Sequence, residues 1–438
     1  MKILHTSDWH LGQYFMGKSR QLEHQKFLKW LIRVAIDQRV DVILVAGDIF
    51  DIGSPPSYAR ELYNRFVVEL QEAVEDKAIK LIVLAGNHDS AATLNESKSL
   101  LKAFNTHVIT NAMEKVDDHV IPITNNKGEI EAFVCAIPFL RPKDISSSSA
   151  GETGGEKQRN LLESIVNFNQ AVVECAKNKS QQAVPIILTG HLTVIGSSTS
   201  DSVRDIYIGS LEAFPASMFP DVDYIALGHI HKPQIIAKSD HIRYSGSPIP
   251  LSFDELQYEK KVLIAEFDKE KLTTVHETPV PTFQMMKQIK GDISEIESQL
   301  QKLIATHSIA SQANVGSEPI DAFEQNTIWL DIEVNTQDFL GDLQKRVESI
   351  VIDTLLDVLM IRRVRPREHS SLESLDELSL NELKPIDVFN KRLDLEQWPG
   401  EQAELKHRMQ SMFNKLLSDQ ENEEQEQTEV TMLSGSEL

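Results

Sequence analysis

The sequence of 438 residues predicts an α/β protein followed by a smaller α+β domain. Two observations lead to this fold class. Short aliphatic runs alternate with amphipathic helical stretches up to about residue 278, which is typical of strands covered by helices. From about residue 279 a different succession of helices and strands begins. We therefore expect a first domain over residues 1–278, a second over 279–368, and a linker with short helices and an acidic tail over 369–438.

The strands expected in the first domain are aliphatic almost throughout. After the apolar start at residues 1–4, these runs are "VDVILVAGD", "IKLIVLAGNHD", "VPIILTGH" and "VDYIALGHIH". Such runs are typical of strands that helices bury on both faces. One covering helix is predicted where apolar residues recur along a single face, at Phe27, Leu28, Leu31, Ile32 and Ala35. Between residues 141 and 158, "SSSSAGETGG" predicts a flexible loop, and a helix over 160–177 follows it.

The second domain is predicted from two helices and two strands in alternation. The first helix contains Ile293, Ile296, Leu300, Leu303 and Ile304, and the second contains Leu343, Val347 and Ile350. The strands are "TIWLDIEV" and "VLMIRRVR".

Two short helices are expected near the C-terminus. Pro385 opens the first, and the second presents Leu405, Met409, Met412, Phe413 and Leu416. Both are too small to form a core of their own, so they pack either on their own chain or on a partner. The tail "DQENEEQEQTEV" has the composition of a disordered segment.

Composition excludes several classes of protein. The longest aliphatic runs are far shorter than the roughly 18 to 20 residues that span a bilayer, and the N-terminus lacks a secretory layout, so we expect a soluble cytoplasmic protein without membrane contact. The two isolated cysteines, Cys135 and Cys175, indicate neither a disulfide framework nor a thiolate metal site.

The formal charge of −22 disfavours a chain that grips nucleic acid by its own surface alone. Any contact with a polyanion must therefore be local, or come from bound metals or from a partner. One candidate is the arginine-rich stretch "IRRVRPRE" at Arg362, Arg363, Arg365 and Arg367, although a solvated strand end is the favoured interpretation of such a run.

Five of the aliphatic runs end in side chains that are potential metal ligands. A single Asp-x-His, such as Asp8 and His10, is usually a turn carboxylate beside a solvated imidazole. Here the other runs end alike, and the full set is Asp8, His10, Asp48, Asn87, His191, His229 and His231. Sites in α/β sheets form beyond the carboxyl ends of strands, so these side chains can converge. Glycines precede four of the five groups and permit close backbone approach, namely Gly47, Gly86, Gly190 and Gly228.

Seven oxygen and nitrogen ligands without sulfur are too many for one zinc ion and suit two ions that share a bridging carboxylate. Asp48, on a central run, is the expected bridge. Two divalent ions beside two carboxylates leave positive charge for a phosphodiester and a hydroxide. Paired ions of this kind hold the attacking and leaving oxygens of an in-line displacement at phosphorus. The set therefore predicts phosphoester hydrolysis.

Two further residues are candidates for catalysis. His88 is adjacent to Asn87, so its side chain is free to donate a proton to the leaving oxygen or to stabilise charge on the phosphate. Asp51 is placed to orient that imidazole, or alternatively to cap the turn before "SPPSYAREL".

The stretches "DWH", "GDIFD", "GNHD", "GH" and "GHIH" resemble the signature of calcineurin-like metallophosphoesterases. Further stretches resemble the SbcD family of bacterial nuclease subunits over nearly the whole chain, among them "AIPFLRP", "SDSVRDIYIGSLEAFPA", "DYIALGHIHKPQ", "YSGSPIPLSFDE" and "ELSLNELKPIDVFNKRL". The resemblance implies a sandwich of two sheets flanked by helices, with a capping domain over the DNA.

The resemblance also implies an activity and partners. It implies a manganese-dependent exonuclease on double-stranded DNA ends and an endonuclease on single strands and hairpins, acting in DNA replication, recombination and repair. Its partners would be a coiled-coil ATPase subunit, gripped by the C-terminal helices, and a second copy of the chain in a heterotetramer. One metal would be held by Asp8, His10, Asp48 and His231, and the other by Asp48, Asn87, His191 and His229, with His88 as catalytic histidine. The alternative is a phosphodiesterase or phosphatase acting on small molecules or phosphoproteins.

Overall fold

The structure is a computed structural model that divides the chain into two compact units, residues 1–363 and 364–438. Most of the first unit is described, together with residues 408–409 and 411–413 of the second; the parts left out are 75–77, 113–114, 126, 147–151, 181–182, 205, 207–212, 270, 314–326, 336–339, 364–407, 410 and 414–438. Most of the predicted C-terminal helices, the acidic tail and part of the Ser/Gly-rich loop therefore lie outside the described residues.

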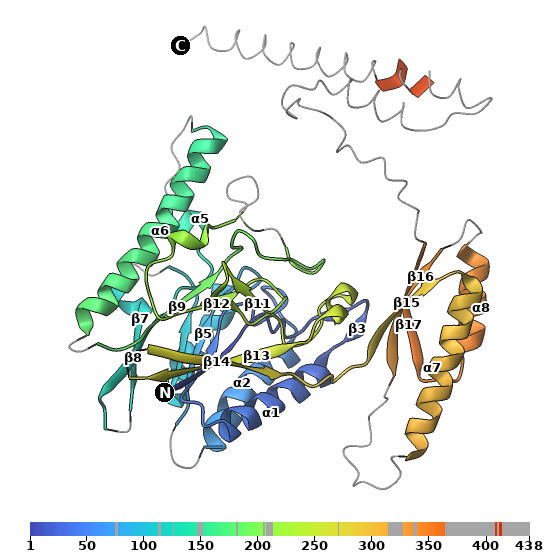
Figure 1. The fold of residues 1–438 in the computed structure, drawn as a ribbon, viewed down its shortest axis with the longest axis horizontal. Helices are drawn as coiled ribbons and strands as arrows, with labels where there is room; N and C mark the ends of the chain where they lie inside the picture. Colours follow the sequence, from blue (N-terminus) through green and yellow to red (C-terminus); the bar gives the residue numbers. More distant parts are fainter. Residues whose placement is uncertain are drawn as a thin grey trace. The chain divides into compact units, whose positions relative to one another are not determined.

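The residues of the expected first domain form two six-stranded sheets (Figure 1). The first sheet has the order β14-β13-β1-β4-β5-β6, formed by Lys271–Pro279, Lys261–Asp268, Lys2–Thr6, Val42–Val45, Lys80–Leu84 and Thr106–Ile109. The second has the order β11-β12-β10-β9-β8-β7, formed by Gln234–Ile236, Ser239–Tyr244, Tyr224–Gly228, Ile186–His191, Ile130–Cys135 and Val120–Thr124. The central strands of each sheet run parallel, so their carboxyl ends share one edge.

Alternate residues of the strands face two different cores. Leu44 and Ile82 of the first sheet pack against Ile187 and other apolar residues of the second. Their chain neighbours pack instead against helices α1 (Gln21–Asp37) and α2 (Ser57–Glu72), while α6 (Gly154–Lys179) covers the second sheet. The first domain is thus a four-layer sandwich, which confirms the expected fold class and explains why the strands are aliphatic on both faces.

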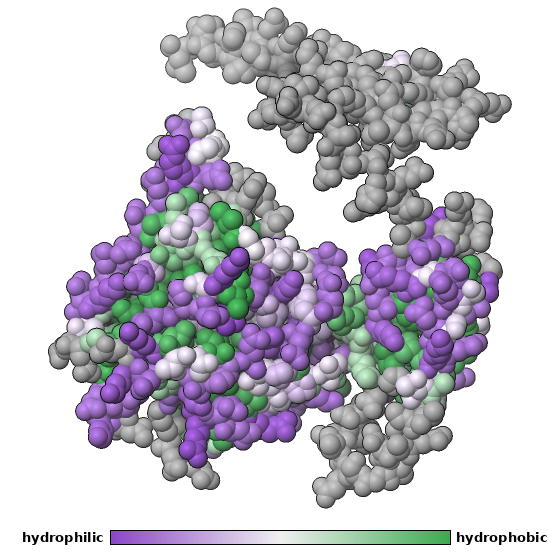
Figure 2. Space-filling view, viewed as in Figure 1, coloured by the Kyte–Doolittle hydropathy of each residue, from purple (hydrophilic) through white to green (hydrophobic). Residues whose placement is uncertain are grey.

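The helices follow the predicted apolar faces, with one difference in length. All five residues predicted for the first covering face are buried in α1. Helix α6 begins at Gly154, six residues earlier than predicted, because Thr153 and Glu156 form a reciprocal capping box. Two of the three glycines in the stretch that predicted a loop, Gly154 and Gly155, therefore lie in its first turn. Short helices α3 (Ala91–Asn95), α4 (Lys98–Leu101) and α5 (Pro142–Ile145) fill the connections, and Figure 2 shows apolar side chains gathered around α6 on an otherwise mostly hydrophilic face.

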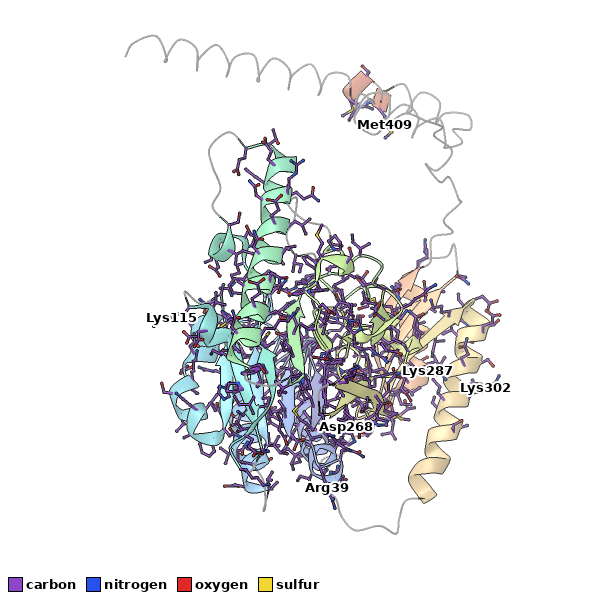
Figure 3. The ribbon with its side chains drawn as sticks, turned by 60° about the vertical axis from the view of Figure 1, so that its left-hand side comes forward. Arg39, Lys115, Asp268, Lys287, Lys302 and Met409 are labelled. Carbon is purple, nitrogen blue, oxygen red and sulfur yellow. The ribbon has the colours of Figure 1, made fainter. Side chains whose placement is uncertain are left out.

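The second domain is a three-stranded parallel sheet with two helices on one face. Its elements are β15 (Met286–Gly291), α7 (Ile293–Ala313), β16 (Ile328–Val334), α8 (Leu340–Val351) and β17 (Leu356–Arg363), and Figure 3 labels Lys287 on β15 and Lys302 on α7. Strand β15 was missed because "MKQIKG" is mostly polar. Of the arginine-rich stretch, Arg362 donates to the buried Asp331 carboxylate at 2.7 Å, so this side chain is held by its own sheet.

Within the compact unit of residues 1–363, a small aromatic cluster joins the three-stranded sheet to loops beside the six-stranded sheets. Phe15, in the hairpin of β2 (Tyr14–Phe15) and β3 (Lys18–Ser19), stacks on Trp329 with ring centroids 5.8 Å apart. Phe253 of the short 3-10 helix η4 (Phe253–Gln257) packs edge-on against Phe15. An ion pair of 2.5 Å between Lys18 and Asp357 lies beside this contact. In the part of the chain that is described, no helix combines the length and apolar character needed to cross a bilayer.

Candidate metal centre

All seven predicted ligands lie at the carboxyl ends of strands, and they come from both sheets. Asp8 and His10 follow β1, Asp48 follows β4 and Asn87 follows β5, whereas His191 ends β9 and His229 and His231 follow β10. Six of the seven are buried and Asn87 is half-buried. The structure therefore brings the whole predicted set together where the ends of the two sheets meet.

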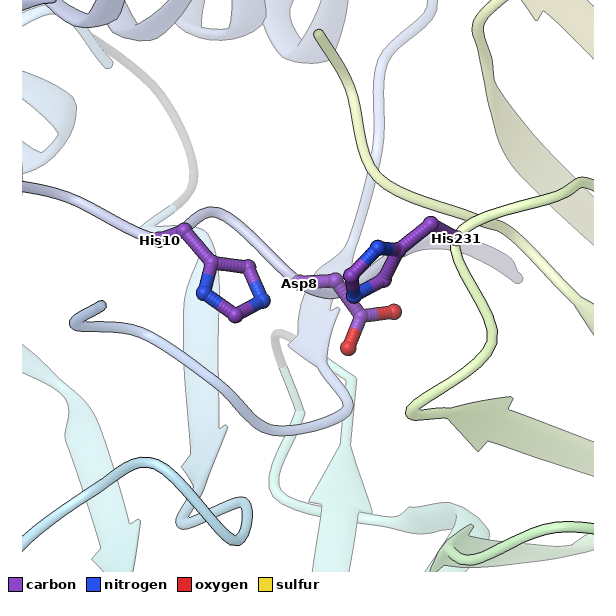
Figure 4. Close-up of side chains that lie close together, drawn as sticks. All are labelled: Asp8, His10 and His231. Atoms are coloured by element: carbon purple, nitrogen blue, oxygen red, sulfur yellow. The ribbon is translucent and has the colours of Figure 1, made fainter. Parts of the chain in front are cut away.

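The ligand atoms form two adjacent groups. Atoms of Asp8, His10 and His231 lie within 4.8 Å of one another, and these side chains point toward each other in Figure 4. Asp48, His191 and His229 form a second group, whose ligand atoms also lie within 4.8 Å of one another. Asn87 belongs to the second group, because its Oδ1 lies 2.9 Å from His191 Nε2 and 3.0 Å from His229 Nδ1.

Asp48 lies between the two groups. Its Oδ2 is 3.3 Å from His191 Nε2 in one group and 3.7 Å from His10 Nε2 in the other. A carboxylate in this position is the one that two neighbouring cations can share. The other oxygen, Oδ1, accepts a hydrogen bond from the backbone N–H of His88 at 2.9 Å, which fixes the carboxylate between the groups.

The buried imidazole nitrogens fit bound cations. Among the described residues, His10 Nε2 and His229 Nε2 are buried without a hydrogen-bond partner, which is costly for a polar atom. The Nδ1 atoms of His10 and His191 instead have acceptors, Asp51 Oδ1 at 3.2 Å and the Ala46 carbonyl at 2.9 Å. Holding Nδ1–H in this way leaves the Nε2 lone pair for a metal. The donor set, with carboxylate, amide and imidazole but no thiolate, fits a pair of divalent ions.

The loops that carry the ligands have an unusual backbone. Asp8, His10, Asp48 and His229 have φ values of 54°, 48°, 50° and 91°, in the left-handed region that non-glycine residues rarely adopt. Hydrogen bonds between the loops hold them there, with Asp8 N–H donating to the Gly47 carbonyl at 3.0 Å and His10 N–H to the Asp48 carbonyl at 3.1 Å. Residues in such conformations concentrate at functional sites.

Close packing explains three of the four predicted glycines. A Cβ on Gly86 would lie 2.1 Å from Asp48 Oδ1, and one on Gly228 would lie 1.9 Å from the Ala46 carbonyl oxygen. Gly47 likewise leaves no room, because its Cβ would collide with the His191 ring. At Gly190 an added Cβ would meet only side-chain atoms, the nearest at 3.2 Å, so no close backbone approach requires glycine there.

The carboxylates give the centre a negative potential that attracts cations. Burial alone would lower the pKa of His191, yet the Asp48 carboxylate raises it to about 9. Burial likewise opposes charge on Asp48, yet the neighbouring imidazoles hold the pKa of this carboxyl well below its usual range. The pKa of His229 lies well below its usual value because burial dominates there. Asp48 thus stays ionised beside the ligand atoms.

His88 lies at the edge of the centre, with its ring 4.6 Å from that of His10. Its Nδ1 donates to the backbone carbonyl of Asp51 at 2.6 Å. The Asp51 carboxylate bonds His10 Nδ1, so Asp51 contacts both histidines and reaches His88 through its main-chain carbonyl. Asp51 is not the N-cap of the helix that follows, because the N-cap of α2 is Pro56 without a side-chain cap bond.

Two buried carboxylates next to the centre were missed from the sequence. Asp89 accepts hydrogen bonds from the backbone N–H groups of Ile49, Phe50 and Gly86, and so ties two ligand loops together. Its place directly after "GNH" could have suggested this role. Glu255 contacts the ring of His231 at 3.2 Å, and nothing in "SFDE" distinguishes it from an exposed turn residue.

Known proteins resemble this chain over both domains. A model of the calcineurin-like phosphoesterase family matches residues 1–233, and one described as type 5 capsule protein repressor C-terminal domain matches residues 282–397. The SbcD protein of the SbcCD nuclease from Escherichia coli strain K12 is 47% identical over 418 residues, which cover 95% of this chain and 98% of that protein. The chain belongs to the SbcD family. Relatives in this family from Rhodobacter capsulatus and Bacillus subtilis are 33% and 32% identical, each over 61% of this chain and 66% of the relative.

The family match covers the candidate metal centre. The match to the calcineurin-like phosphoesterase model contains all seven ligands and both candidate catalytic residues. The chain is therefore a hydrolase of the metallophosphoesterase class.

Proposed function

We propose that this chain is a two-metal DNA nuclease, with exonuclease activity on double-stranded ends and endonuclease activity on single strands and hairpins. The observation that supports this most is the set of seven ligands in two groups around Asp48, in a chain 47% identical to the SbcD protein of a nuclease named SbcCD. Its role would be the processing of DNA ends during replication, recombination and repair.

Each group of ligands would hold one divalent ion, which we propose to be Mn²⁺. Asp8, His10, Asp48 and His231 would hold the first ion, and Asp48, Asn87, His191 and His229 the second. When bound, two such ions acidify a water molecule and stabilise the charge that develops on the phosphate. The protein itself supplies a rigid, buried ligand set that needs little rearrangement to bind them.

His88 would act as the general acid that donates a proton to the leaving oxygen. The hydrogen bond from Nδ1 to the Asp51 carbonyl fixes the ring and its tautomer, so Nε2 is the nitrogen that can give a proton to the leaving oxygen. Burial lowers the pKa of His88 below its usual value, which makes the protonated ring a stronger acid. Asp51 would act on the metal ligand His10 as well as on His88.

The activity is tested with a labelled DNA hairpin. We expect the purified chain to cut it with Mn²⁺ present and to stop when a chelator removes the metal, and the reaction is run both without and with the coiled-coil ATPase and ATP. Hydrolysis of a simple phosphodiester or cyclic nucleotide with no cutting of DNA under either condition would overturn the nuclease proposal. It would favour the alternative of a small-molecule phosphodiesterase or phosphatase with the same centre.

The C-terminal segment would bind the ATPase subunit. We propose a nuclease domain over residues 1–278, a capping domain over 279–368 and a partner-binding segment over 369–438, with two copies of the chain in a heterotetramer. Deleting residues 380–438 should abolish association with the coiled-coil subunit, because the two short apolar helices expected there are removed. Size-exclusion chromatography of the mixed subunits measures this, and Mn²⁺-dependent cutting of single strands should remain. Association that survives the deletion would refute this role.

A further inference from the structure

Glu255 is a fully buried carboxylate outside the ligand set that contacts one of the ligands. Its Oε1 lies 3.2 Å from His231 Nδ1, and its Oε2 forms an ion pair of 2.5 Å with Lys260. The remaining donors around it are backbone and hydroxyl groups, from Ser200, Ser202, Ser247 and Leu251. So many donors around a buried carboxylate keep it ionised and hold it in one position.

These hydrogen bonds determine which nitrogen of His231 carries a proton. Ser202 Oγ lies 2.6 Å from His231 Nδ1 and donates its own proton to Glu255 Oε1, so this hydroxyl can only accept from the ring. Nδ1 of His231 is therefore the protonated nitrogen, facing both the hydroxyl and the carboxylate. The Nε2 lone pair remains for the group formed by Asp8, His10 and His231.

Lys260 also contacts His231, through the main-chain carbonyl of that residue. Its Nζ donates to the His231 carbonyl at 3.2 Å and to Ser247 Oγ at 2.7 Å, in addition to Glu255. The Glu255–Lys260 pair therefore fixes both the ring and the backbone of a single ligand.

The two ligand groups differ in the acceptors that face Nδ1 of their histidines. In the first group, His10 and His231 each have a carboxylate at Nδ1, from Asp51 and Glu255. In the second group, His191 has only the Ala46 carbonyl at that position. A carboxylate behind an imidazole raises its basicity and orients it as a metal ligand.

We infer that Glu255 is a positioning residue for the first metal site: it fixes the ring and tautomer of His231 and so sets the affinity of that site, without acting on the second. This inference rests on the proposed two-metal function. Removing an outer partner of this kind typically costs about 10 to 100-fold in metal affinity.

The test measures Mn²⁺ binding to the metal-free full-length chain, with free Mn²⁺ counted by electron paramagnetic resonance. For Glu255→Gln we expect one of the two affinities to fall by about 10-fold or more and the other to stay within twofold. Glu277→Gln is the matched control, because Glu277 is a partly exposed carboxylate that also pairs with a lysine, Lys261. It should leave both affinities unchanged.

Thermal unfolding of the metal-free variants separates positioning from a general loss of structure. If Glu255→Gln does not fold, the double variant Glu255→Gln/Lys260→Met removes the uncompensated lysine charge and is measured instead. Two unchanged affinities, or an equal fall in both, would overturn the inference. Failure of the unaltered chain to bind two ions would overturn the proposed function, and this inference with it.

Discussion

Replacing Asp48 should have the largest effect of any single substitution in this chain. Asp48→Ala is expected to lower kcat/KM for DNA cleavage by roughly 10³-fold or more, since stabilisation of transition-state charge by metals contributes several kcal/mol and each 1.36 kcal/mol is tenfold in rate. The reason is its position: Asp48 is the carboxylate that contacts both ligand groups, through His191 and His10. Both ions should bind more weakly as a result.

Cleavage of the labelled hairpin over a range of Mn²⁺ concentrations measures this effect. Asp48→Asn keeps the size of the side chain and removes its charge, so it should also be inactive if the charge is what the ions need. Asp268→Ala serves as a control, because Asp268 is an exposed residue at the end of β13 (Figure 3). An Asp48→Ala variant that cuts at the normal rate would rule out a bridging role.

Replacing His88 should separate chemistry from metal binding. His88→Asn is expected to lower the rate of cleavage by roughly 10² to 10⁴-fold, which is what a positioned proton donor typically contributes. Its ring contacts the Asp51 carbonyl and the His10 ring, and its ligand atom lies within 4.8 Å of those of His10 and Asp51, but it belongs to neither of the two groups that contain Asp8 or Asp48. Affinity for both ions should therefore stay close to that of the unaltered chain.

Single-turnover cleavage and Mn²⁺ binding, measured on the same preparation, test this pair of expectations. His276→Asn is a suitable control, because His276 is an exposed histidine on β14 that pairs only with the surface residue Glu266 among the ion pairs described. Loss of an ion from His88→Asn would instead place His88 among the ligands and contradict its catalytic role.

The convergence of the seven side chains could be predicted from the sequence, because parallel strands place their carboxyl ends at the same edge of a sheet. Each run that ends in a ligand is apolar enough to be recognised as a buried strand, and the ligand follows within a few residues. The prediction did not require the arrangement of the strands. The structure places β1, β4 and β5 in one sheet and β9 and β10 in the other, and the same side chains still converge at the shared edge.

What the sequence could not supply are the contacts made by the supporting residues. Asp51 lies in a loop where its carboxylate could reach His10 or His88, and only the structure shows that it bonds His10. Glu255 lies 24 residues from His231 and has no local pattern that would reveal its burial. Strand β15 was missed for a related reason, since its few apolar residues give no recognisable alternation.

The left-handed backbone at Asp8, His10, Asp48 and His229 sets stability against activity in this protein. Such conformations cost of order 1 to 3 kcal/mol each, and buried carboxylates crowd the same loops. The metal-free chain therefore holds backbone strain in the loops that carry its candidate ligands, and bound ions would offset this cost by mass action. Under selection for thermal stability alone, without a requirement for cleavage, substitutions should accumulate first in these loops. The resulting proteins should be more thermostable but inactive.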